Sequence, residues 1–210
     1  CWYCAYKADN LQLGKDMKKM DFIPSKKMSE ILEDIIEMDV KAVTFSGGGD
    51  PFYYPYLLEA VKKLSRTPVK FAALTNGAGL HGEIAEMFSH HGTWLRISID
   101  GWDDESYSFY RGVQRGEFAK VIKNMENFKK MGGRCFLGIS LIVDKKNASH
   151  VFEFIKRLKN VGVDSVKVSP CIPSESVDEN NNYHKGVFKE VEEQINKALE
   201  EFSGDNFEIY

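Results

Sequence analysis

Apolar residues recur along this chain at two spacings. Between residues 28 and 36 they fall at the three- and four-residue intervals of an amphipathic helix, and the run Ala42 to Phe45 is short, continuous and ended by three glycines. This pattern indicates a helix that leads into a buried strand, and it repeats along the chain. We expect helices at 28–36, 57–64, 84–88, 118–128, 151–158 and 184–202, and strands at 42–45, 69–74, 94–99, 135–143 and 165–168.

Alternating helices and strands imply parallel strand pairing through right-handed crossovers. Because the strands are almost continuously apolar, we expect a sheet covered by helices, in an α/β barrel or an open parallel sheet. Polar residues follow several strands, at the edge where such folds bind ligands. The polar segment 173–183 is expected to be a long exposed loop, with a lid as the alternative.

Composition narrows the class of protein. With 210 residues, 43% of them hydrophobic and 28% charged, we expect one domain spanning 1–210. The net charge of −3 and the scattered lysines and arginines predict no nucleic-acid partner. No apolar run is long enough for a membrane span and no signal peptide is visible, so we expect no membrane association and a cytoplasmic location.

Two of the four cysteines, Cys1 and Cys4, form a C-x-x-C pair at the start of the chain. Four cysteines are too few for a disulfide scaffold at this length, so the pair favours metal or redox chemistry. A zinc site needs a second ligand pair, which the isolated Cys135 and Cys171 do not supply; we expect Cys135 in the core and leave Cys171 open. Because the first residue is not Met, we expect the sequence to be cropped at its start.

The strand that ends at Phe45 runs into Gly47, Gly48, Gly49 and Asp50. Glycines let a backbone approach a ligand that a side chain would block, and a carboxylate or carbonyl oxygen pairs well with an ammonium group. A site for a small ligand with an amine is therefore one interpretation. A structural turn without a ligand is the other.

With its cysteine pair and glycine turn together, the chain resembles the radical S-adenosylmethionine (radical SAM) superfamily. There, three cysteines spaced C-x-x-x-C-x-x-C hold a [4Fe–4S] cluster, usually with an aromatic residue before the last one. Cys1 and Cys4 match the second and third ligands and Tyr3 matches the aromatic residue. The first ligand would lie four residues before Cys1. The resemblance implies a partial TIM barrel of the (βα)6 type, with the first strand cropped.

The resemblance also implies roles for other residues. The turn Gly47 to Asp50 would bind the methionyl amino group of SAM, with Asp in place of the more usual Glu. Ser98 would contact the ribose, and Arg111 the methionyl carboxylate, for which a guanidinium is well shaped. Asn76, in Thr75-Asn76-Gly77, would lie near the cofactor or substrate, with a plain turn as the alternative. Asp100 would either belong to the site or cap the following turn.

By the same resemblance, the activity is reductive cleavage of SAM to a 5′-deoxyadenosyl radical, which takes hydrogen from a peptide or small-metabolite substrate. A flavodoxin or ferredoxin would supply the electron. Some members carry a further, SPASM-like cluster domain after the barrel; none is visible here. Two other classes stay open: a zinc- or redox-binding C-x-x-C module without radical chemistry, and an aldolase-like barrel.

Overall fold

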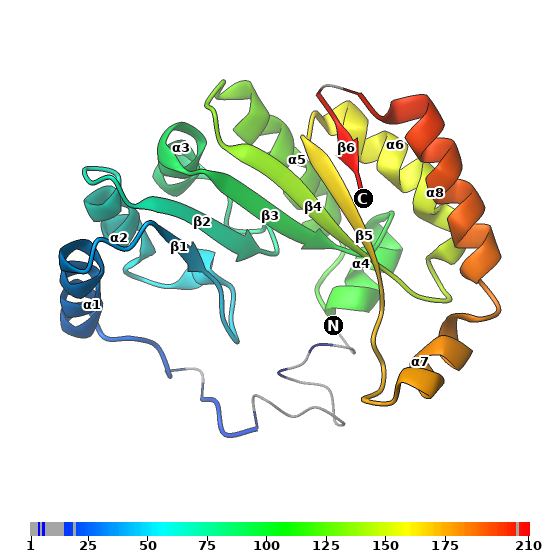
Figure 1. The fold of residues 1–210 in the computed structure, drawn as a ribbon, viewed down its shortest axis with the longest axis horizontal. Coiled ribbons are helices and arrows are strands. Elements are labelled where there is room, and N and C mark those ends of the chain that lie inside the picture. The colour runs from blue at the N-terminus through cyan, green and yellow to red at the C-terminus, as the bar shows by residue number, and fades with distance from the viewer. Residues whose placement is uncertain (1–3, 5, 7–14, 19, 205) are drawn as a thin grey trace.

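The structure, a computed structural model, describes residues 4, 6, 15–18, 20–204 and 206–210. Its centre is one sheet in which six strands lie in chain order and every neighbouring pair is parallel. All strands therefore end at the same edge of the sheet (Figure 1). The strands are β1 (Ala42–Phe45), β2 (Lys70–Thr75), β3 (Trp94–Ile99), β4 (Phe136–Val143), β5 (Ser165–Pro170) and β6 (Glu208–Ile209).

Helices follow one another around the outside of the curved sheet (Figure 1). In chain order they are α1 (Ser25–Glu37), α2 (Leu57–Leu64), α3 (Gly82–His91), α4 (Asp104–Arg111), α5 (Glu117–Lys130), α6 (Val151–Val161), α7 (Val177–His184) and α8 (Phe188–Phe202), with short 3-10 helices at Pro51–Tyr53 and Ala148–His150. Contacts run α1 to α2, α2 to α3, α3 to α5, α5 to α6 and α6 to α8. The expected α/β fold with a parallel sheet is confirmed.

The two faces of the sheet differ in burial. On β3, Leu95, Ile97 and Ile99 are fully buried in the core under the helices, whereas the alternate residues, including Arg96 and Ser98, are only half-buried. We call the face that carries these alternate residues the open face. It comprises the same register positions on the neighbouring strands, since side chains alternate along each strand.

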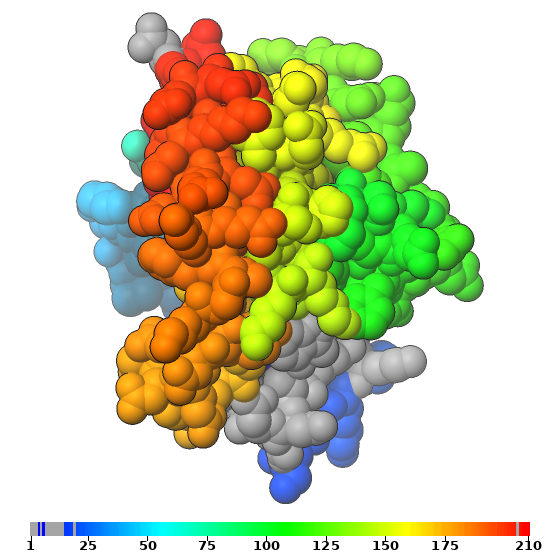
Figure 2. All heavy atoms as spheres, turned by 90° about the vertical axis from the view of Figure 1, so that its right-hand side faces the viewer, coloured from blue at the N-terminus to red at the C-terminus, as the bar shows by residue number. Residues whose placement is uncertain are grey.

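The end of the chain differs from the expectation. Residues 173–183 are not all loop, because Val177–His184 form α7, whose first turn is capped by the Ser176 side chain. The helix expected at 184–202 begins only at Phe188 and packs against α6 (Figure 2). At this contact the rings of Phe152 and Phe202 are 5.2 Å apart. Helix α7 has no buried residue, so it carries no apolar stripe that the sequence pattern would reveal.

Two further elements were not expected. Strand β6 is only two residues long, and α4 is a short helix directly after β3. Among the described residues, no helix is both long and apolar enough to cross a membrane.

Candidate functional site

The glycine turn after β1 opens onto a cavity of about 470 Å³, lined also by Met17, Phe22 and Tyr54. None of Gly47, Gly48 and Gly49 has a positive φ, so the backbone conformation does not itself require glycine. A Cβ at Gly47 or Gly49 would meet no atom of the described residues within 4 Å, whereas one at Gly48 would collide with the Met17 side chain. At two of the three glycines, therefore, nothing in the described chain explains the missing side chain.

Asp50 joins the ends of the first two strands. Its carboxylate accepts hydrogen bonds from the backbone N–H of Phe52 at 2.9 Å, from the Thr75 hydroxyl at 2.9 Å and from the backbone N–H of Asn76 at 2.5 Å. It thereby caps the short helix Pro51–Tyr53 and fixes the glycine turn to the end of β2. A carboxylate has about four acceptor positions, so one remains for a ligand donor.

Asn76 lies in the turn that follows β2. Its side-chain oxygen accepts a hydrogen bond from the backbone N–H of Ala78 at 2.8 Å, while its own N–H binds Asp50. This is the Asx turn that the sequence offered as the alternative to a binding role. The structure thus gives Asn76 a local structural contact and places it next to the glycine turn.

Ser98 and Asp100 lie at the end of β3. Ser98 is half-buried on the open face, opposite Ser140 of β4 in the strand register. Asp100 is 1% exposed. The side chain that caps the next helix, α4, is that of Asp103, which accepts a hydrogen bond from the backbone N–H of Ser106.

Arg111, the last residue of α4, reaches back to Asp100. Its Nη2 lies 2.8 Å from Asp100 Oδ2, and its side chain is only 13% exposed. The pair is therefore buried and not a surface ion pair. The Nε of Arg111 is buried without a hydrogen-bond partner among the described residues, which leaves one guanidinium donor unused.

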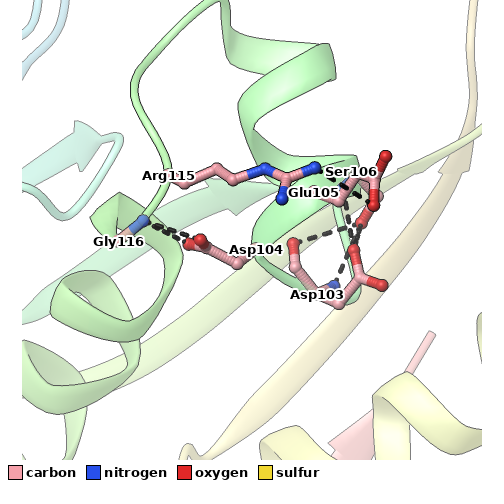
Figure 3. A network of polar contacts seen from close by, with 6 residues as sticks. All are labelled: Asp103, Asp104, Glu105, Ser106, Arg115 and Gly116. Atoms are coloured by element: carbon pink, nitrogen blue, oxygen red, sulfur yellow. Dashed lines mark hydrogen bonds and ion pairs between the residues drawn. The ribbon is translucent and has the colours of Figure 1, made fainter.

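The N-terminal end of helix α4 makes contacts within its own first turn and with the loop that follows the helix (Figure 3). Asp103 and Ser106 form a reciprocal capping box at its start. Asp104 accepts two bonds from the backbone N–H of Gly116, at 2.6 and 2.7 Å, and Arg115 lies 3.3 Å from Glu105. These contacts tie the loop after α4 back onto the helix.

Asp144 is a buried carboxylate that the sequence analysis did not single out. It follows β4 directly, is 1% exposed, and its Oδ1 accepts from the hydroxyl of Tyr110 and the backbone N–H of Lys146. Burial, and then the bond to Asp144, raise the pKa of Tyr110. Asn147, in the same turn, donates to the backbone oxygens of Asp100 and Ile142. The sequence feature that could have identified Asp144 is its position directly after a strand, which matches the position of Asp100 after β3.

Of the cysteine pair, Cys4 is described, as a half-buried free thiol. Cys1 and Tyr3 lie outside the described residues. Cys135 is 3% exposed in the core, as expected, and Cys171 is 1% exposed at the end of β5. Burial raises the pKa of each of the latter two thiols to about 12, so both are protonated at neutral pH. Protonated buried thiols make poor metal ligands.

The site residues form two contact groups at one edge of the sheet. The glycine turn, Asp50 and Asn76 lie at the ends of β1 and β2, and Ser98, Asp100 and Arg111 at the end of β3 and on α4. Open backbone, an acidic group and an unsatisfied guanidinium donor fit a ligand with an amine and a carboxylate. SAM carries both groups.

Comparison with known proteins identifies the class. The family model described as the radical SAM superfamily matches residues 1–151, and the chain belongs to that superfamily.

Individual relatives are more distant. The chain is 26% identical over 174 residues to the "Probable GTP 3',8-cyclase" of Sulfolobus acidocaldarius. The aligned region covers 82% of this chain and 52% of that protein. Its fold resembles that of Streptococcus suis SuiB bound to S-adenosylmethionine, with a TM-score of 0.68 and 17% identity over 90% of this chain and 42% of SuiB. It also resembles anSMEcpe with bound AdoMet and a peptide, with a TM-score of 0.64 and 18% identity over 94% of this chain and 58% of anSMEcpe. These likenesses confirm the partial-barrel fold. The chain spans about half the length of the relatives it matches.

Proposed function

We propose that this chain is the core domain, over residues 1–210, of a radical SAM enzyme. Cys1 and Cys4, with a third cysteine expected upstream, hold a [4Fe–4S] cluster, and Tyr3 lies beside it. When bound, the cluster and SAM supply a 5′-deoxyadenosyl radical that removes hydrogen from the substrate. The buried, protonated Cys135 and Cys171 support the assignment of the ligands to the first pair.

In this proposal, the carbonyl groups of the glycine turn and the remaining acceptor position of Asp50 bind the methionyl ammonium. Arg111 offers its unused Nε–H to the methionyl carboxylate, and Asp100 holds the guanidinium in place. Ser98 contacts the ribose from the open face. Asn76 keeps the β2 turn against Asp50, which positions the ammonium site.

The observation that carries the proposal is the open space at Gly47 and Gly49. Neither residue has a positive φ, and neither has a neighbour among the described residues that a Cβ would touch. A structural turn would tolerate side chains there. The glycines are explained if a ligand approaches the backbone at this point.

The substrate is a peptide or a small metabolite. Support comes from relatives of both kinds: one is named as a probable GTP cyclase, and SuiB has been seen with the precursor peptide SuiA. An external flavodoxin- or ferredoxin-type protein supplies the electron. We further propose a cytoplasmic location, where reduced thiols are maintained.

The test is SAM binding by Gly49→Val. Because a Cβ at Gly49 meets no atom of the described residues, the fold should tolerate the substitution, whereas SAM affinity should fall by at least about tenfold through steric exclusion. Gly186→Val, between α7 and α8, is the matched control, since a Cβ there also meets no atom within 4 Å in the described part of the chain. Isothermal titration with SAM measures both. Equal affinity for SAM in the two variants would overturn the placement of SAM at this turn.

A further inference from the structure

Arg96 lies on the open face of the sheet, two residues before Ser98 on β3. Among the described residues it has no acidic partner within ion-pair distance: its Nη2 donates to the phenol oxygen of Tyr210 at 2.5 Å. Its guanidinium also lies 5.7 Å from the centre of the Trp94 ring. The Nε–H is buried and has no hydrogen-bond partner among the residues that the structure describes, which is unfavourable for a cation.

A second unsatisfied group lies two strands away from Arg96, across Gly138, on the open face. Arg96, Gly138 and Ser165 lie side by side on β3, β4 and β5, and the buried hydroxyl of Ser165 has no hydrogen-bond partner among the described residues. A Cβ at Gly138 would lie 2.9 Å from Ser165 Oγ and 3.7 Å from Arg96 Nε. An oxygen atom above Gly138 would therefore come close to both donors at once.

The charge of the open face favours an anion. Its charged strand positions are Lys70, Arg96 and Lys167 against the single carboxylate of Glu208, although the whole chain is acidic at −3. Lys167 is exposed and lies opposite Ser140 in the register, one step closer to the strand ends than Arg96. Neither Lys167 nor Glu208 takes part in an ion pair within the described part of the chain.

The space above Gly138 belongs to a cavity of about 270 Å³ whose walls include Trp94, Arg96, Phe136 and Gly138. Two residues along a strand span about 7 Å, so this cavity lies within the length of a small molecule from Ser98. In the structure, the hydroxyl oxygen of Tyr210 accepts the hydrogen bond from Arg96. Its side chain is half exposed, so an incoming anion can replace the phenol without disturbing the core.

We propose that Arg96, Ser165 and Lys167 form an anion site over Gly138 that binds a carboxylate or phosphate group of the substrate. Trp94 and Phe136 pack against the rest of the molecule, which extends toward Ser98. The assignment of the anion to the substrate rests on the proposed function, because it takes the strand ends at Ser98 as the place of SAM. The anion site itself does not depend on SAM.

The experiment is a titration of the full protein with inorganic pyrophosphate and, separately, with succinate, at low salt and without SAM. Isothermal titration measures affinity, and the change in Trp94 fluorescence reports where the anion binds; Trp94→Phe should remove that change. We expect saturable binding of at least one probe. Binding of pyrophosphate alone assigns a phosphate-bearing substrate, and binding of succinate alone a carboxylate.

Variants locate the site. Arg96→Met should weaken binding by about tenfold or more, the loss of one charge-assisted hydrogen bond. Ser165→Ala should weaken it severalfold while leaving stability unchanged or higher, because it removes an unsatisfied buried hydroxyl. Arg115→Met, on the exposed Arg115–Glu105 pair, is the control and should bind as the wild type does.

Two results would overturn the anion site: no saturation by either probe, or equal binding by the Arg96→Met and Arg115→Met variants. Neither result affects the SAM site, which the Gly49→Val titration tests independently. Conversely, loss of the SAM assignment would leave pyrophosphate or succinate binding at Arg96 unchanged. The two failures are therefore distinguishable.

Discussion

Arg111 Nη2 lies 2.8 Å from Asp100 Oδ2, which joins the end of α4 to the end of β3 through a buried ion pair. The two residues are eleven apart in sequence, and the capped helix α4 brings them together. Because Asp100 is 1% exposed, the carboxylate depends on its partners to remain charged.

Removing the cation of this pair should destabilise the protein. Arg111→Met should lower the free energy of unfolding by about 3 kcal/mol, because it leaves the Asp100 carboxylate buried without its cation. The double variant Asp100→Asn/Arg111→Met should lose less stability than the sum of the single variants. Urea denaturation of all four proteins measures the coupling; additive losses would contradict a direct interaction.

Gly101 gives a test of how α4 is positioned. A Cβ at Gly101 would collide with the backbone of Tyr107, so Gly101→Ala should displace the helix and cost about 3 kcal/mol of unfolding free energy. Gly112→Ala is the control at the other end of α4, where space is open but φ is +64°, and should cost about 1 kcal/mol. If the two variants were equally stable, the close packing at Gly101 would be wrong.

Much of the fold was predictable from the sequence. The five longer strands and the helices with a buried stripe, such as α5, have the periodicity that burial imposes. Helix α7 has no buried residue and β6 has two residues, so neither leaves a pattern in the chain. Local periodicity reports packing against a core, and these elements hardly touch one.

The backbone turn of the site was predictable from the sequence, whereas the side-chain pairs that support it were not. The glycine turn is contiguous in sequence, and the residue types alone suggest a close approach. Tyr110 and Asp144 are 34 residues apart, and only the fold places the hydroxyl of one on the carboxylate of the other. The same holds for Thr75 and Asp50, 25 residues apart.

The Tyr110–Asp144 contact has a measurable consequence. Tyr110→Phe removes the hydroxyl that donates to the buried carboxylate and should cost about 1 to 3 kcal/mol of unfolding free energy. Tyr53→Phe, at an exposed tyrosine, should cost almost nothing. Thermal or urea unfolding measures both, and a neutral Tyr110→Phe would show that the bond contributes nothing to stability.

The buried thiols predict a loss of stability at high pH. Burial raises the pKa of Cys135 from 9.0 to about 12, so above pH 9 the unfolded chain releases this proton while the folded chain keeps it. The contribution of this thiol to the free energy of unfolding is fully present below pH 9. It falls by about 1.4 kcal/mol per pH unit as the pH rises above that value. Between pH 9.5 and 11, Cys135→Ala should show a shallower fall than the wild type. Parallel stability curves would contradict the raised pKa.

The central claim is that Cys4 is a cluster ligand. The most direct measurement is anaerobic reconstitution of the full-length protein with iron and sulfide, followed by assays of bound iron and of SAM cleavage to 5′-deoxyadenosine under reducing conditions. We predict that the wild type and Cys135→Ala bind iron and cleave SAM, whereas Cys4→Ala does neither. Iron binding and SAM cleavage by Cys4→Ala at the wild-type level would contradict the account.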